Sequence, residues 1–200
     1  MNFLAHFYLS QNNEALIVGN FLANQVKGRN FEGVDKNIIQ GVLHHRFIDN
    51  FTDTHPNVLL VNSLFRPNQG KFSGVASDIL FDHILAQNWA NYSDISLTSF
   101  TQNIYQILNL YQNQFEAFTL LTYQKMMEHN WLFNYQFEEG VKRALFGMSK
   151  RSRFENNLAN AFSDYQSHKQ EVDNLFFEFF EDFKIENERF IHQLFNNNSA

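Results

Sequence analysis

Residues 77–89 read SDILFDHILAQNW, and the rest of the chain is organised around this stretch. At about 100° per residue on an α-helix, Asp78 and Asp82 lie on one stripe. The same stripe carries the apolar residues Val75, Leu85 and Trp89. The spacing therefore predicts a helix that turns two carboxylates towards the core of the protein.

Two carboxylates on a buried face need a compensating partner. Like charges one turn apart are unfavourable even on an exposed helix, and burial adds to the cost unless a cation or a hydrogen-bond donor is present. A divalent metal ion is one such partner, because carboxylates and an imidazole from His83 suit Mn, Mg, Fe or Zn. The alternative is structural: the pair caps a neighbouring helix or holds Arg46.

A second stretch, GVLHHRFIDNFTDTHP at residues 41–56, repeats this pattern. One helical stripe carries Ile38, Val42, His45 and Asp49, and Asp53 extends it. Because apolar residues give way to ligand-type residues on one face of each helix, we expect the polar groups to be buried and to converge. Helical bundles build metal sites in this way. The two stretches together predict a metal or catalytic cluster, although a single buried histidine is more often a hydrogen-bonded core residue.

The composition indicates an all-α protein. The 200 residues include only two prolines and eight glycines, and alternating β-branched runs are few. Phenylalanine occurs 24 times and provides large side chains to bury between helices. A chain of this length can form one substantial core. We therefore expect a single helical-bundle domain over residues 1–195 and a disordered tail at residues 196–200.

The sequence also argues against several classes of protein. Without cysteine there is no disulfide and no thiolate, so any metal is held by nitrogen and oxygen. A net charge of −6 argues against a nucleic-acid partner. The apolar start, MNFLAHFYLS, is short and lacks a basic region. We therefore expect no signal peptide, no membrane span and a cytoplasmic location.

Helical periodicity and helix breakers predict the remaining elements. Helices are expected at residues 2–9, 14–27, 35–50, 57–65, 97–111 and 138–146, with a polar connection at 66–74. Residues 115–136 are expected to form two helices with a break near 128–130, and 153–195 one long helix or two with a kink. In the helix at 14–27, Asn20 and Asn24 share a stripe with Ile17, so amides occupy positions where core residues are expected.

A basic segment lies between residues 142 and 153. Its sequence, VKRALFGMSKRSRF, contains no acidic residue. The five cations are Lys142, Arg143, Lys150, Arg151 and Arg153. A solvated helix end has this composition, and so does a surface that docks an acidic partner or a phosphate.

Five motifs follow one another along roughly residues 1–155: MNFLAHFYLS, GNFLANQVKG, HHRFIDNFTDTHP, FSGVASDILFDHILAQNW and GMSKRSR. Their order resembles that of bacterial acyl carrier protein phosphodiesterases, relatives of the metal-dependent HD-domain phosphohydrolases. The resemblance implies an all-α fold like that of the HD-domain enzymes. It also implies a bound divalent metal, Mn²⁺ first and Mg²⁺ or Fe²⁺ as alternatives. The implied reaction hydrolyses the 4′-phosphopantetheine arm from holo acyl carrier protein and gives the apo form.

The resemblance also carries roles over to individual residues. The expected metal ligands are His6, His45, Asp49, Asp78, Asp82 and His83. The expected catalytic residues are Asn24, Arg46, Asp49 and Asp82, and Asp53 belongs to the same motifs. Lys27, Arg46 and the five cations of the basic segment are expected to contact the acidic carrier. Within that segment, we expect Arg151 and Arg153 to face the substrate and Lys142 and Arg143 to form the rim.

One position departs from the family pattern. The pattern reads GNxLADxxKG, and this chain has Asn24 where the Asp belongs. An amide oxygen can coordinate a hard cation, but it brings no charge and cannot act as a base. Two alternatives to the implied reaction therefore stay open. They are an HD-type phosphohydrolase acting on a small nucleotide, and a catalytically impaired homologue that binds acyl carrier protein.

Overall fold

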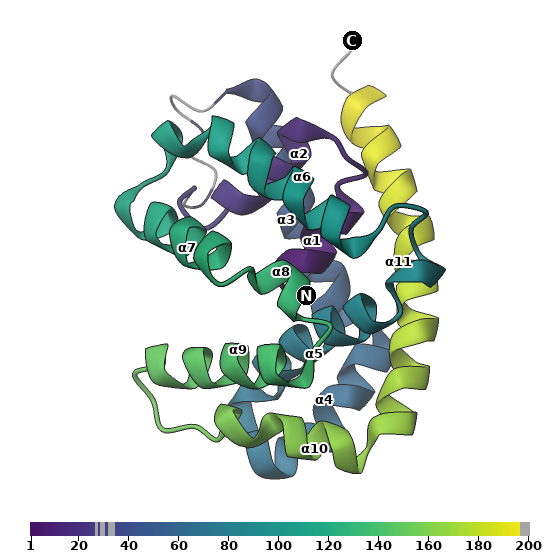
Figure 1. Cartoon of the computed structure of the whole chain (residues 1–200). Helices are drawn as coiled ribbons and strands as arrows, with labels where there is room; N and C mark the ends of the chain where they lie inside the picture. The colour runs from purple at the N-terminus through teal and green to yellow at the C-terminus, as the bar shows by residue number, and fades with distance from the viewer. Residues whose placement is uncertain (27, 29–30, 32–34, 197–200) are drawn as a thin grey trace.

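The computed structural model describes residues 1–26, 28, 31 and 35–196. Within these ranges every regular element is helical, which confirms the expected all-α fold (Figure 1). The helices are α1 (Phe3–Leu9), α2 (Glu14–Leu22), α3 (Lys36–Thr54), α4 (Pro56–Gln69), α5 (Ser73–Gln87), α6 (Leu97–Leu110), α7 (Ala117–Glu128), α8 (Trp131–Asn134), α9 (Glu138–Arg151), α10 (Ala161–Ser167) and α11 (Lys169–Asn196). The 3₁₀ turns are η1 (Gly70–Phe72), η2 (Trp89–Asn91), η3 (Gln112–Gln114) and η4 (Leu158–Asn160).

The core forms around the short helix α1 and the helix α5. Leu4 and Phe7 of α1 are fully buried, and α5 is buried on nearly every side. Figure 1 shows α1 near the centre of the molecule and α11 running along one side. Phe176 and Phe183 of α11 lie seven residues apart on one aromatic stripe of the helix and are fully buried. Because α1 is central, its polar residue His6 is held inside the protein as well.

Two glycines let α2 and α3 pack closely. A Cβ atom at Gly19 would lie 2.3 Å from the carbonyl oxygen of Ile38, and one at Gly41 would lie 2.5 Å from that of Ala15. These separations are too short for any side chain, so the contact requires glycine on both helices. Since α2 also packs against α1, this contact places the polar stripe of α3 beside the centre of the molecule.

Three helices extend further than the sequence indicates. α3 continues to Thr54, so Asp53 lies on it, and it stops before Pro56 as expected. α4 passes through Pro67 and is followed by η1, so the connection predicted at residues 66–74 is wrong. The buried side chain of Phe65 anchors this end of α4 and outweighs the helix-breaking tendency of the proline. α9 runs to Arg151 and includes most of the basic segment.

One helix is shorter than expected: α2 ends at Leu22, whereas the prediction runs over residues 14–27. The remaining boundaries agree more closely with the prediction. Ser96 caps α6 by accepting a hydrogen bond from the backbone N–H of Ser99, and α7 and α8 are separated at residues 129–130. The C-terminal region forms two helices that break at His168. Asn196 is the last residue of α11, and residues 197–200 of the expected tail lie outside the described residues. None of the described helices has the length and apolar character that crossing a membrane requires.

Candidate metal centre

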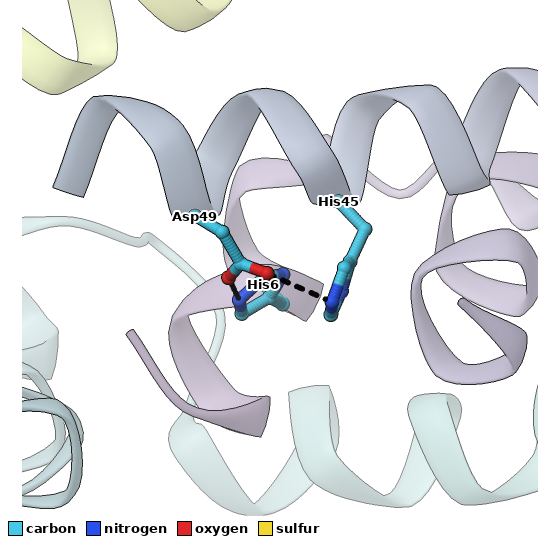
Figure 2. Close-up of side chains that lie close together, drawn as sticks. All are labelled: His6, His45 and Asp49. Carbon is cyan, nitrogen blue, oxygen red and sulfur yellow. Dashed lines mark ion pairs between the residues drawn. The ribbon is translucent and has the colours of Figure 1, made fainter. Parts of the chain in front are cut away.

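The side chains of His6, His45 and Asp49 meet between α1 and α3 (Figure 2). Nε2 of His6 lies 3.3 Å from Oδ1 of Asp49, and Nε2 of His45 lies 3.1 Å from its Oδ2. The potential ligand atoms of the three residues all lie within 4.8 Å of one another. In the part of the chain that the structure describes, this is the one set of three or more such side chains close enough to share a metal ion. We call these three residues the metal group.

In the metal group His6 is buried, His45 is partly buried and the carboxylate of Asp49 is open to solvent. His45 and Asp49 are one turn apart on α3, as the sequence spacing predicts. His6 comes from α1 with its side chain 5% exposed, and the centre of its ring lies 4.4 Å from that of His45. The side chain of Asp49 is 47% exposed. A substrate can therefore approach the metal group from the side of this carboxylate.

Asn20 determines which nitrogen of His6 carries the proton. Nδ2 of Asn20 donates to the carbonyl oxygen of Leu16, so its Oδ1 is the atom that lies 2.8 Å from Nδ1 of His6. Nδ1 of His6 therefore donates, and Nε2 presents its lone pair to Asp49. Burial lowers the pKa of His6, against the opposing influence of Asp49, and this favours the neutral ring.

The residues of the metal group fit a divalent cation. The lone pair on Nε2 of His6 and the Oδ1 atom of Asp49 repel each other at 3.3 Å unless a cation lies between them. Burial alone would raise the pKa of Asp49, but the hydrogen bond with His45 holds it far below its usual range, so the carboxylate is ionised. Two imidazoles and one carboxylate suit Mn, Fe or Zn and leave coordination positions for water and substrate.

Hydrogen bonds behind His6 continue to the C-terminal helix. Nδ2 of Asn20 lies 3.0 Å from Nδ1 of His44, and Nε2 of His44 lies 2.6 Å from Oδ1 of Asn187 on α11. Nδ2 of Asn187 donates to the carbonyl oxygen of Leu9, so its Oδ1 accepts from Nε2 of His44. Nδ1 of the neutral His44 ring is then an acceptor and faces Asn20. Burial lowers the pKa of His44 to about 4, so this ring is neutral too.

Asn20→Ala is expected to weaken Mn²⁺ binding about 10- to 100-fold, which is the usual cost of removing the partner that orients a ligating histidine. Calorimetric titration with Mn²⁺ in chelator-free buffer measures this change. Asn187→Ala is the control, because it removes hydrogen bonds from the far end of the same network. It should lower the melting temperature and leave the Mn²⁺ affinity unchanged. Equal losses of affinity in both variants would contradict a specific role for Asn20.

Asp82 and Asp78 have partners outside the metal group. Asp82 is fully buried and accepts hydrogen bonds from the backbone N–H groups of Leu4 and Ala5 at 2.8 and 3.1 Å. Asp78 lies 2.8 Å from the N-terminal ammonium of Met1. Asp82 thus caps the first turn of α1, which is the structural alternative that the sequence left open. Burial raises the pKa of Asp82 to about 7, although the two backbone hydrogen bonds act in the opposite direction.

His83 is a hydrogen-bonded core residue. Its Nδ1 lies 2.6 Å from the carbonyl oxygen of Tyr135, and its ring packs against Phe162 and Tyr165. Burial is the main cause that lowers its pKa. The structure therefore does not bring His83 to the metal group, and the same holds for Asp78 and Asp82.

Three further residues of the motifs lie around the metal group but not in it. Asp53 is exposed on the last turn of α3. Arg46 donates from Nη2 to the carbonyl oxygen of Val26, and its guanidinium lies 5.5 Å from the ring centre of Phe31. Asn24 is exposed in the turn after α2 and lines a cavity described below. The amide at position 24 therefore belongs to the wall of this cavity.

The basic segment is divided differently from the expected arrangement. Arg143 and Arg151 lie two turns apart on one face of α9 and line the same cavity. Lys142 instead forms an ion pair with Glu138, and Lys150 lies 5.3 Å from the ring centre of Phe146. Arg153 is exposed beyond the end of α9. Lys27 lies outside the described residues.

Sequence reasoning missed two residues of the network behind His6. His44 stands next to the predicted ligand His45, and Asn187 stands four residues after the buried Phe183. A polar residue in register with a buried aromatic stripe is the signal that could have identified Asn187. Its partner could not be identified, because His44 is 143 residues away in the sequence.

These features define an all-helical protein with a candidate centre of two histidines and one aspartate for a divalent metal. The family model described as acyl carrier protein phosphodiesterase matches residues 1–183. The chain belongs to this family. The family model stops matching at residue 183, so Asn187, the C-terminal member of the hydrogen-bond network behind His6, lies beyond the matched segment.

Curated relatives carry the same description. The acyl carrier protein phosphodiesterase of Photorhabdus laumondii is 29% identical over 188 residues, which cover 90% of this chain and 91% of the relative. Those of Klebsiella pneumoniae strain 342 and Enterobacter sp. strain 638 are 30% and 28% identical and cover 90% of this chain and 94% of each relative. No solved structure matches the chain. The expected likeness to the HD-domain fold therefore stays a prediction.

Proposed function

We propose that this chain is a metal-dependent phosphodiesterase that hydrolyses the 4′-phosphopantetheine arm from holo acyl carrier protein and leaves the apo form. The family and the names of the relatives supply the substrate class. The observation that carries the proposed chemistry is the lone pair of His6 facing the ionised Asp49 at a site open to solvent.

Each residue of the metal group would contribute differently to binding a cation. His6 and His45 present nitrogen ligands, and Asn20 keeps the proton of His6 on the far side of its ring. Asp49 provides the negative charge and the open approach for the phosphodiester. A bound divalent ion, Mn²⁺ first and Mg²⁺ or Fe²⁺ as alternatives, supplies Lewis acidity that offsets charge on phosphoryl oxygens and makes water more nucleophilic.

Local charge has to overcome the repulsion between this acidic chain and an acidic carrier. The net charge of −6 acts only over short distances, because the Debye length is about 8 Å at physiological salt. Arg143 and Arg151 place two guanidinium groups on one face of α9. A guanidinium can bind a carboxylate or a phosphate through two parallel hydrogen bonds. We therefore assign carrier binding to this face of α9.

Arg143→Gln and Arg151→Gln are each expected to weaken carrier binding by about 1 kcal/mol or more, and most strongly at low salt. Lys142→Gln is the matched control, because the ammonium of Lys142 is already paired with Glu138. Its effect should be smaller than that of either arginine variant. Titrations with apo carrier at two ionic strengths measure the three affinities. If the affinities proved indifferent to all three substitutions and to salt, the segment would be a solvated helix end.

Mass spectrometry of the carrier tests the proposed reaction. Holo acyl carrier protein is incubated with the protein and Mn²⁺, and a parallel sample contains excess chelator. The proposal predicts loss of one phosphopantetheine arm with Mn²⁺ and no loss with chelator. Binding without loss would instead show a non-catalytic carrier binder. Turnover of small nucleotides alone would show an HD-type nucleotide phosphohydrolase, and either result would overturn the proposal.

A further inference from the structure

A cavity of about 540 Å³ lies between α1 and α5 on one side and α7, α8 and α9 on the other. In Figure 1 these helices surround the chain start, with α8 between α7 and α9. Its walls are mainly apolar and include Phe3, Phe21, Ile79 and Trp131. Amide and hydroxyl groups are also present, from Asn24, Asn134, Thr119 and Thr122. This volume and lining are typical of a site for a small organic group.

The wall formed by α9 carries three small residues. Gly140, Ala144 and Gly147 recur at helical spacing along it, and the last two lie between the two cavity arginines, beside Met148. A Cβ atom at Gly147 would meet no described heavy atom within 4 Å, so this glycine faces open space. Gly140 is required for close packing against α8, because a Cβ atom there would lie 1.9 Å from the carbonyl oxygen of Asn134. The open space in front of Gly147 therefore belongs to the cavity and not to a helix contact.

The cavity and the metal group share one face of α1. Asn2 and Phe3 line the cavity, and His6 follows them by four and three residues, which places all three on the same side of the helix. On the neighbouring segment, Asn20 contacts His6, and Phe21 and Asn24 line the cavity. The metal group therefore lies about one helical turn, roughly 5 Å along the axis, from the cavity wall.

We propose that this cavity receives the pantetheine part of the substrate arm, an inference that rests on the proposed function. Pantetheine is a narrow chain with two amides, a hydroxyl and a geminal dimethyl group, and it ends in a thiol. The apolar walls suit its carbon chain, and Asn24, Asn134 and Thr122 can bond its amides. In this arrangement the phosphate end lies at the metal group and the thiol end lies against Gly147.

The positions of the two arginines agree with this orientation. Arg151, Tyr135 and Asn2 all line the cavity, and the hydroxyl of Tyr135 accepts a hydrogen bond from Asn2 at 2.8 Å. Arg151 thus lines the same cavity as the start of α1, where the charged phosphate end would lie. Arg143 stands two turns earlier on α9 and leaves the small residues between them uncharged. The neutral thiol end of the arm is therefore placed where the wall is neutral.

Filling the cavity at Gly147 tests the proposal. Gly147→Leu places a branched side chain in open space, so it should fold, and Gly74→Leu on α5 is the matched control. A Cβ atom at Gly74 would have only the Nδ2 atom of Asn62 as a neighbour, at 4.0 Å. Free pantetheine is titrated into the wild-type protein and both variants and followed by NMR. We expect Gly147→Leu to weaken pantetheine binding about tenfold or more and Gly74→Leu to leave it unchanged.

The outcomes separate this proposal from the proposed function. Binding of pantetheine is measured without turnover, so it reports on the cavity even if the protein released no arm from the carrier. Absence of pantetheine binding by the wild type, or equal binding by Gly147→Leu, would overturn the cavity proposal. Binding of octanoate by a protein that does not bind pantetheine would assign the cavity to an acyl chain and would also overturn the proposal. Loss of arm hydrolysis in Gly147→Leu, with bis(p-nitrophenyl) phosphate hydrolysis retained, would support the proposal.

Discussion

Asp49→Asn is expected to lower the turnover of holo acyl carrier protein about a hundredfold or more and to remove bound Mn²⁺. The carboxylate of Asp49 contacts both histidines of the metal group, and its replacement leaves only neutral ligands. A catalytic metal contributes several kcal/mol of charge stabilisation, and each loss of about 1.4 kcal/mol lowers the rate tenfold. Arm release by mass spectrometry and metal content by elemental analysis measure the two effects.

Asp94→Asn is the matched control for this variant. Asp94 is exposed in the loop before α6 and lies outside the metal group, so the same chemical change there should leave turnover and metal content unaltered. Far-ultraviolet circular dichroism should show that both variants keep their helices. An Asp49→Asn protein with full metal content and full turnover would contradict the assignment of the metal group.

Asp82→Ala is expected to lower the free energy of unfolding by about 3 kcal/mol or more. The substitution leaves the buried N–H groups of Leu4 and Ala5 without their acceptor, and each unsatisfied group costs about 1–3 kcal/mol. It also removes the carboxyl group at the positive end of α1, where the helix dipole favours the ionised form. Urea denaturation of the metal-free protein measures the loss. The folded variant should still bind Mn²⁺ with wild-type affinity, because Asp82 lies outside the metal group.

Asp82→Asn refines this test of the cap. Its amide keeps one carbonyl oxygen, so one of the two backbone N–H groups retains an acceptor. The loss in unfolding free energy should therefore lie between those of the wild type and Asp82→Ala. The opposite pattern, in which both variants lose metal but keep their stability, would make Asp82 a metal ligand and refute its role as the cap of α1.

The two polar stripes show how far the sequence could predict the site. Helical spacing correctly turned the apolar start of the α3 stripe and Asp82 of the α5 stripe towards the interior, but Asp49 is half exposed and Asp53 is exposed. On α3 the stripe meets His6, and a metal group results. On α5 it meets the backbone N–H groups at the start of α1, which satisfy Asp82 without a metal. The sequence could not distinguish a metal site from a helix cap. Every residue except proline carries a backbone N–H, so no residue type marks the N–H groups that a buried carboxylate will meet.

Contacts between residues far apart in the sequence also limited how much of the rest of the site could be predicted. The all-α fold, the buried aromatic stripe of α11 and the pair His45 and Asp49 follow from local periodicity. The tautomer of His6 depends on Asn20, and the network beyond it depends on Asn187. The cavity depends on six helices that meet only in the folded chain. The tautomer, the hydrogen-bond network and the cavity all depend on tertiary packing, which helical periodicity does not predict.

Pulsed electron paramagnetic resonance of bound Mn²⁺ tests the central claim most directly. The protein is labelled with ¹⁵N at histidine and loaded with one equivalent of Mn²⁺. The assignment of the metal group predicts ¹⁵N couplings from two imidazoles, and His45→Ala should remove one of them while His83→Ala removes neither. Mn²⁺ that binds without any histidine coupling would place the metal among the aspartates near Asp78 and Asp82 and would contradict the account.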